Sequence, residues 1–218
     1  MSVKDNNIVI IDYGMGNLRS VENAFLKINK LHKEYNAKVT VSRDIDVIKN
    51  ATKVVLPGVG AFGDCMRNLQ NYGLVDVIKE TIASGKPFLG ICVGLQLLFE
   101  KSEEAFNING LGIFKGTVSK IKAPNLKIPH MGWNDLTTNN EKSYLFENIP
   151  RNPYVYFVHT YHAKPEDKNI ISSITTYGET VTGSISYKNI QAVQFHPEKS
   201  GNIGLNILVN FQKGGLNL

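Results

Sequence analysis

One cysteine stands between two glycines in a segment suited to present a nucleophile. Gly90-Ile91-Cys92-Val93-Gly94 follows Pro87-Phe88-Leu89, which predicts a short buried strand, and precedes the helix-forming run Leu95–Glu100. Small residues around a nucleophile permit a sharp strand-to-helix turn that exposes its side chain. A free cysteine is often only a small buried hydrophobe, but a plain strand-to-helix junction does not need two glycines. We therefore interpret Cys92 as a nucleophile.

A base and an acid follow each other closely near the other end of the chain, in Gln194-Phe195-His196-Pro197-Glu198. A free thiol is only about 3% ionised at neutral pH and needs a group that accepts its proton. The positive end of a helix that begins at Val93 would give further help. Residues two apart in extended chain point the same way. Glu198 can then accept the second N–H of His196 and stabilise the imidazolium, as Asp does in a serine triad.

The oxyanion of such a reaction needs N–H donors. Pro57-Gly58-Val59-Gly60 follows an apolar run, and glycines allow backbone amides to approach a substrate closely. The amide that follows the nucleophile is the usual second donor of an elbow. A tight turn would equally explain 57–60 taken alone, but its position after a neighbouring strand favours an oxyanion hole formed by Val59, Gly60 and Val93.

The elements that must position these groups alternate in the first half of the chain. Ile8–Ile11, Lys38–Val41 and Lys53–Leu56 are apolar or β-branched runs typical of strands in a parallel sheet. Between the first two lies an amphipathic stretch that Asn17 can cap. This alternation predicts an α/β fold, a doubly wound domain with a mostly parallel central sheet of the flavodoxin-like kind.

The second half changes to short strands, which predict additional antiparallel pairing. A hairpin turn is expected at Lys188-Asn189, and a last helix at Ile203–Phe211. We see no repeat or linker and expect one domain over residues 1–218. The expected strands are Gly116–Ile121, Tyr154–His159, Ile170–Thr175, Val181–Tyr187 and Ile190–Phe195.

Composition limits the other possibilities. The net charge of +5, from 24 basic and 19 acidic residues, indicates an ordinary solvated surface, and no basic run is dense enough for nucleic acid. Two cysteines, Cys65 and Cys92, cannot build a disulfide framework and match no zinc spacing. His130, His159 and His162 share no metal motif, so we expect no metal. The polar start and the lack of a long apolar run predict a cytoplasmic protein.

The segments around Cys92 and His196 resemble the signature blocks of the class I, triad-type glutamine amidotransferases. The resemblance implies hydrolysis of the side-chain amide of L-glutamine to L-glutamate and ammonia, without a cofactor. In that reaction Cys92 attacks the amide carbon, His196 protonates the departing ammonia, and water cleaves the glutamyl thioester. Glu198 completes the triad.

Further blocks resemble one branch of this family, the glutaminase subunits of imidazole glycerol phosphate synthase in histidine biosynthesis. They include Asp12–Leu18, Pro129–Asn134 and Tyr156–Tyr161, and Leu95 stands where anthranilate and carbamoyl-phosphate relatives usually have His. The resemblance implies that the glutamine is held by Gly58, Gln96, Glu104, Thr160 and Tyr161.

The same resemblance implies a partner, a barrel-shaped cyclase subunit that consumes the ammonia to make imidazole glycerol phosphate and AICAR. A closed route between the two sites would keep ammonia from becoming ammonium in water. Glutamine hydrolysis is then expected to be weak until the partner binds its own ligand. The expected contacts with the partner are Asn17, Met131, Trp133, Tyr156 and Lys199.

Other interpretations remain at this point. The chain could be the glutaminase of another synthase, such as anthranilate synthase, or a γ-glutamyl hydrolase, although Pro129–Asn134 argues against both. A non-catalytic regulatory subunit would not need Cys92, His196 and Glu198 together. A cysteine protease normally orients its base with a distant Asn or Asp, whereas His196 and Glu198 are close in sequence.

Overall fold

An eight-stranded sheet forms the centre of the computed structural model, which describes residues 6–139 and 141–214. Most of the polar start of the chain lies outside this range. The first five strands run parallel to one another, and the last three pair antiparallel. In spatial order the strands are β2 (Lys38–Ser42), β1 (Asn7–Ile11), β3 (Lys53–Gly58), β4 (Phe88–Cys92), β13 (Ile190–Val193), β12 (Glu179–Tyr187), β11 (Ile171–Tyr177) and β8 (Thr137–Thr138).

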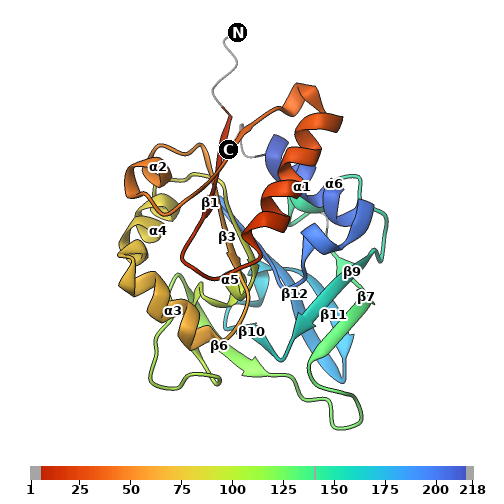
Figure 1. Ribbon diagram of the computed structural model, residues 1–218. Helices are drawn as coiled ribbons and strands as arrows, with labels where there is room; N and C mark the ends of the chain where they lie inside the picture. Colours follow the sequence, from red (N-terminus) through yellow and green to blue (C-terminus); the bar gives the residue numbers. More distant parts are fainter. Residues whose placement is uncertain (1–5, 140, 215–218) are drawn as a thin grey trace.

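Helices cover both faces of the parallel part (Figure 1). Helices α1 (Leu18–Leu31) and α6 (Gly201–Lys213) lie on one side, and α2 (Ile45–Lys49), α3 (Phe62–Asn71) and α4 (Leu74–Ala83) on the other. Strands β3 and β4 are therefore buried along their whole length, as continuous apolar runs in parallel sheets require. The order β2-β1-β3-β4-β13 is the flavodoxin-like order, so the predicted fold class is confirmed.

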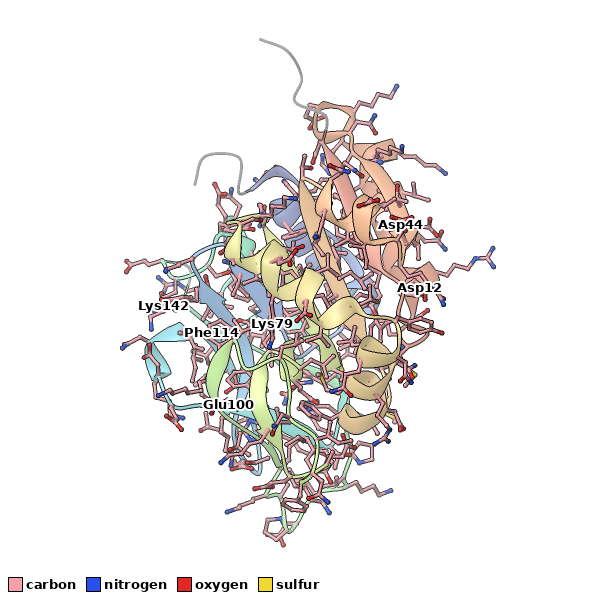
Figure 2. All side chains as sticks on the ribbon, turned by 90° about the vertical axis from the view of Figure 1, so that its left-hand side faces the viewer. Asp12, Asp44, Lys79, Glu100, Phe114 and Lys142 are labelled. Carbon is pink, nitrogen blue, oxygen red and sulfur yellow. The ribbon has the colours of Figure 1, made fainter. Side chains whose placement is uncertain are left out.

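Two smaller sheets carry most of the remaining strands. One pairs β10 (Tyr161–Pro165), β6 (Phe114–Lys120) and β5 (Phe99–Ser102), and the other pairs β7 (His130–Asp135) with β9 (Tyr154–His159). Figure 2 labels Glu100 and Phe114 on the first of these sheets, and also Asp44, whose carboxylate caps α2 by accepting the amides of Asp46 and Val47. Short 3-10 turns are η1 (Lys33–Tyr35), η2 (Tyr144–Phe146), η3 (Lys168–Ile170) and η4 (Pro197–Lys199).

The helix predicted at Leu95–Glu100 is wrong. The helix after the elbow, α5, covers only Val93–Gln96, and Phe99–Ser102 is strand β5. Leu97, Leu98 and Phe99 are all buried, and their carbonyls accept amides from residues 111–114. Pairing with this segment and with β6 outweighs the local helix propensity.

Two further expectations need adjustment. Asn17 stands at the N-cap position of α1, but its side chain makes no capping hydrogen bond. Strands β7 and β10 lie in segments for which no strand was predicted. Strand β9 has the predicted bounds. The predicted turn at Lys188-Asn189 joins β12 to β13, and Lys188 has a φ of 51°.

A buried lysine fastens the end of α6 to the sheet. The ammonium group of Lys53, at the start of β3, donates to the backbone carbonyls of Phe211 (3.2 Å), Gln212 and Gly214 (2.8 Å). These carbonyls lie at the C-terminal end of the helix. The last carbonyls of a helix have no N–H partner within it and carry partial negative charge. Burial lowers the pKa of Lys53 to about 8.

Candidate active site

The turn at Cys92 has the strained geometry of a nucleophile elbow. Strand β4 ends at Cys92, whose φ of 55° and ψ of −109° are unusual for a residue with a side chain. Glycines surround it because the backbones are in contact: a Cβ on Gly94 would lie 1.9 Å from the Leu56 carbonyl oxygen, and one on Gly90 would lie 2.9 Å from the Gly94 carbonyl oxygen. The sequence pattern thus follows from the close approach of α5 to β3 and β4.

The structure places His196 and Glu198 in contact. The Nδ1 atom of His196 lies 2.8 Å from Oε1 of Glu198, and both side chains are almost fully buried. A carboxylate only accepts hydrogen bonds, so Nδ1 carries the proton and Nε2 is left to face its own partner. Within residues 6–139 and 141–214, no protein atom is in hydrogen-bonding geometry with Nε2.

Cys92 and His196 line the same cavity. Burial disfavours the imidazolium, but the Cys92 sulfur and the Glu198 carboxylate outweigh this and raise the pKa of His196 to about 10. The two groups are therefore in electrostatic contact, although the hydrogen bond between them is not formed in good geometry. Such bonds commonly tighten only when substrate is bound. The arrangement can hold a thiolate beside an imidazolium.

The helix dipole contributes less than the sequence predicts. Helix α5 has only four residues, and a macrodipole needs several aligned peptide groups. Activation of the Cys92 thiol consequently depends on His196 and on the polar groups around the sulfur.

The loop expected to form the oxyanion hole is held from behind by two side chains. The hydroxyl of Tyr13 donates to the Pro57 carbonyl at 2.9 Å, and the thiol of Cys65 donates to the Val59 carbonyl at 3.6 Å. A planar trans peptide places its N–H opposite its C=O. The amide of Gly60, which has φ 98°, therefore points away from Cys65. Burial raises the pKa of the Cys65 thiol to about 11, so it stays a donor.

The cavity in front of Cys92 has a volume of about 270 Å³, which suits a small amino acid rather than a polypeptide segment. Most of the predicted site residues line it. Glu104 also accepts the amide of Phe62 at 2.7 Å. The predicted residues on its wall are Val59, Gly60, Cys92, Val93, Gln96, Glu104, Thr160, Tyr161 and His196.

Gly58 is not on this wall. It is the last residue of β3, beside Cys92 in the sheet register. A Cβ on Gly58 would lie 2.8 Å from the Gly94 amide nitrogen and 2.9 Å from the Tyr13 hydroxyl. Its place in the structure is explained by close packing beneath the elbow.

Two buried histidines form a neutral pair at the cavity, with His159 on its wall. Nδ1 of His159 donates to the Tyr161 carbonyl at 2.9 Å, so Nε2 of His159 must accept from Nδ1 of His130, 3.0 Å away. Burial lowers the pKa of His159 to about 3 and that of His130 to about 4. Across the described ranges, no three His, Cys, Asp or Glu side chains are grouped to hold a metal ion.

One residue next to the nucleophile had no role assigned from the sequence. Gln194 is fully buried, and its Nε2 lies 3.7 Å from the Cys92 sulfur. Its carbonyl oxygen accepts from Nε2 of Gln96 at 3.1 Å. The only sequence signal for this contact was its position two residues before His196.

The residues expected to meet a partner gather mainly on strands β7 and β9. Met131 and Trp133 are 62% and 54% exposed, unusual for such large apolar side chains. Trp133 contacts the ring of Tyr156 edge-on, and the Lys199 ammonium lies over the Tyr156 ring, 6.0 Å from its centre. Asn17 lies at the start of α1, which packs against η4.

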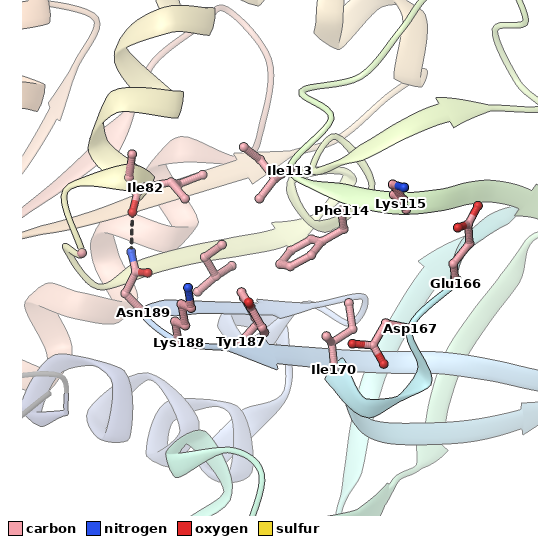
Figure 3. A pocket seen from close by; sticks show the side chains of 13 residues that line it. Ile82, Ile113, Phe114, Lys115, Glu166, Asp167, Ile170, Tyr187, Lys188 and Asn189 are labelled. Atoms are coloured by element: carbon pink, nitrogen blue, oxygen red, sulfur yellow. Dashed lines mark hydrogen bonds between the residues drawn. The ribbon is translucent and has the colours of Figure 1, made fainter.

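A larger cavity lies elsewhere and, within the described part of the chain, is lined by no cysteine, serine, threonine or histidine. It has a volume of about 730 Å³ and lies at the opposite end of the sheet, where β13 begins at Ile190 (Figure 3). Its floor is apolar, with Phe114 and Ile170, and Asn189 closes one end by donating to the Ile82 carbonyl at 2.9 Å. The smaller cavity at Cys92 is therefore the candidate active site, because it holds the reactive groups.

Comparison with known families gives a match that spans this cavity. The model of the family described as "Glutamine amidotransferase class-I" matches residues 9–213, which include every residue of the cavity at Cys92. The chain belongs to this family. Two relatives of the amidotransferase carry a more specific name. A protein of Aquifex aeolicus named imidazole glycerol phosphate synthase subunit HisH is 50% identical over 94% of this chain and 95% of its own length. The protein of the same name from Cyanophora paradoxa is 48% identical over 96% of this chain and 95% of its own.

Solved structures agree on the fold of the amidotransferase. A structure titled "Crystal structure of glutamine amidotransferase" superposes with a TM-score of 0.70 at 15% identity, covering 93% of this chain and 98% of that one. A glutamine amidotransferase from Thermotoga maritima superposes with a TM-score of 0.56 at 17% identity, covering 98% of this chain and 85% of its own.

Proposed function

We propose that this amidotransferase is the glutaminase subunit of an imidazole glycerol phosphate synthase and acts in histidine biosynthesis. It hydrolyses L-glutamine to L-glutamate and ammonia. The observation that carries the proposal is the shared cavity of Cys92 and His196, with Glu198 bonded to the far side of the imidazole at 2.8 Å.

The reaction follows from these contacts. The Cys92 thiolate attacks the amide carbon of glutamine, and the imidazolium of His196 gives its proton to the leaving nitrogen. Ammonia departs and a glutamyl thioester remains. His196 then takes a proton from water, which attacks the thioester and releases glutamate. Glu198 holds the tautomer and stabilises the charge that His196 carries.

The developing oxyanion is bound by backbone amides of Val93, Val59 and Gly60. The Cys65 thiol supports the assignment of Gly60, because it holds the Val59 carbonyl and the N–H of Gly60 lies on the opposite side of the same peptide. Each oxyanion donor in such a site typically lowers the barrier by about 3–4 kcal/mol. Gln96, Glu104, Thr160 and Tyr161 surround the space for the glutamine, and Gly58 contributes by allowing the elbow to pack.

The partner is a cyclase subunit with a barrel fold, which docks on the exposed face of β7 and β9. Trp133 and Met131 supply the apolar centre of that face, and Lys199, Tyr156 and Asn17 border it. This face adjoins the catalytic histidine, because the backbone carbonyl of Tyr156 accepts a hydrogen bond from the amide of His196 at 2.9 Å. Docking there would cover the route by which ammonia leaves. The relatives' names, which describe a synthase subunit, support this assembly.

We propose that the reaction takes place in the cytoplasm, as expected from the sequence. Among the described residues, no helix is both long and apolar enough to cross a membrane.

Reconstitution with a cyclase subunit tests this function. Cys92→Ala is expected to abolish glutamine-dependent synthesis of imidazole glycerol phosphate while ammonia-dependent synthesis continues. Lys115→Ala, which changes a residue on the wall of the larger cavity at the opposite end of the sheet, is the control and should retain glutamine-dependent synthesis. Loss of both routes in Cys92→Ala would show a structural role instead. Equal glutamine turnover with and without the liganded cyclase would refute activation by the partner.

A further inference from the structure

A chain of hydrogen bonds behind the active site has only one possible direction. The Tyr161 backbone carbonyl can only accept, so the group of Gln96 that lies 2.9 Å from it must be the amide NH₂. The same NH₂ group faces Gln194 at 3.1 Å, so the carbonyl oxygen of Gln194 must be on that side. The NH₂ group of Gln194 is thereby turned toward the Cys92 sulfur, 3.7 Å away.

Burial makes this arrangement rigid. Gln194 is fully buried and Gln96 is 3% exposed, so neither amide can exchange these bonds for bulk water without leaving a polar group unpaired. The anchoring carbonyl of Tyr161 is itself fixed, because it also accepts Nδ1–H of His159 at 2.9 Å. The orientation of Gln194 is therefore set by groups outside the triad.

We propose that Gln194 is a positioning residue for Cys92, which donates one N–H to the sulfur and holds it toward His196 in the thiolate form. A hydrogen bond to a charged acceptor is stronger than one to a neutral group. The bond therefore favours the thiolate over the thiol. Helix α5 after Cys92 has only four residues, so its dipole stabilises a thiolate only weakly. The amide dipole of Gln194 provides the stabilisation that the short helix does not.

A matched control exists in the strand that leads into Gln194. Gln191 is also a buried glutamine, 1% exposed and within β13, but its amide bonds to Ser143 and Ser186. Methionine has a similar length and no N–H donor. Gln194→Met and Gln191→Met thus remove equivalent amides, only one of which faces the nucleophile.

The experiment measures alkylation of Cys92 by iodoacetamide as a function of pH on the full-length chain, with intact mass and peptide mapping to separate Cys92 from Cys65. Gln194→Met is expected to move the midpoint of the Cys92 profile to higher pH and to slow alkylation at pH 7 by about tenfold or more. Gln191→Met should keep the parent profile. Identical profiles for both variants would overturn the proposal.

A second variant covers failure to fold. Gln194→Glu keeps the shape of the side chain but places carboxylate oxygens near the sulfur, and its profile should move to higher pH than that of the parent. An unchanged profile in a folded Gln194→Glu protein would also overturn the proposal.

The inference rests on the glutaminase function only for its kinetic consequence, a lower kcat for glutamine with little change in KM. Alkylation requires no glutamine, so a shifted profile in a protein that shows no glutaminase activity even with the liganded cyclase would refute the function and leave the role of Gln194 intact. A parent-like kcat in Gln194→Met, beside an active parent, would contradict the inference alone.

Discussion

The buried lysine under helix α6 predicts an unusual dependence of stability on pH. Burial lowers the pKa of Lys53 from 10.5 to about 8, although three carbonyls accept its N–H groups. Between pH 8 and pH 10.5 the unfolded chain therefore binds more protons at this site than the folded chain does. The contribution of Lys53 to the free energy of unfolding therefore rises with pH across that window. It is constant below pH 8 and above pH 10.5.

The magnitude follows from the shift. One pKa unit corresponds to about 1.4 kcal/mol, so the full effect is about 3 kcal/mol. About 2 kcal/mol of this is gained between pH 8 and pH 10. For a chain of this size each kcal/mol changes Tm by about 2–4 °C, which gives about 4–8 °C.

The assay compares thermal unfolding at pH 8 and pH 10, followed by circular dichroism, for the parent and for Lys53→Met. Other groups titrate in the same range, so the quantity of interest is the difference between the two proteins. The Tm of the parent should rise relative to that of Lys53→Met by the amount above. Lys38→Met removes a lysine from an exposed strand position and should follow the parent. Parallel curves for parent and Lys53→Met would refute the reasoning.

Three further changes test the site. Glu198→Gln removes the charge that orients His196 and should lower kcat for glutamine about 10³-fold or more with little change in KM, measured as glutamate release with the liganded cyclase; retention of a tenth of the activity would contradict it. Cys92→Gly relieves the strained φ of 55° and should be about 1 kcal/mol more stable than Cys92→Ala in urea unfolding. On helix α3 the order should reverse, with Cys65→Gly less stable than Cys65→Ala. The same order at both positions would show that Cys92 is not strained. Gly94→Ala places a Cβ 1.9 Å from the Leu56 carbonyl oxygen and should cost about 4 kcal/mol or more in thermal unfolding; a parent-like Tm would disprove the close approach.

The parallel sheet was predictable because burial on both faces leaves a strong signal. Ile8–Ile11 is entirely apolar and completely buried, and Pro87–Leu89 and Val54–Leu56 are apolar and buried in the same way. Short continuous apolar runs of this kind are typical of strands that are covered on both faces of a parallel sheet. The elbow was predictable for a related reason. Gly90 and Gly94 stand where backbones touch, and no residue with a Cβ fits at either position.

The segment after the elbow could not be predicted in the same way. Leu97, Leu98 and Phe99 suit a helix or a buried strand equally well. The choice was made by hydrogen bonds with residues 111–114, which lie beyond the reach of the i to i−4 bonds of a helix. The contact of Gln194 with Cys92 has the same origin. It depends on the fixed carbonyl of Tyr161 and on Gln96, and no local pattern records that three-way arrangement.

The nucleophile itself can be identified by labelling with a glutamine-like diazo-ketone, followed by intact mass and peptide mapping. We predict one adduct on Cys92, formed with the liganded cyclase present, suppressed by glutamine and absent in Cys92→Ser. An adduct on Cys65 instead, or no adduct at all under these conditions, would contradict the claim that the cavity at Cys92 binds and cleaves glutamine.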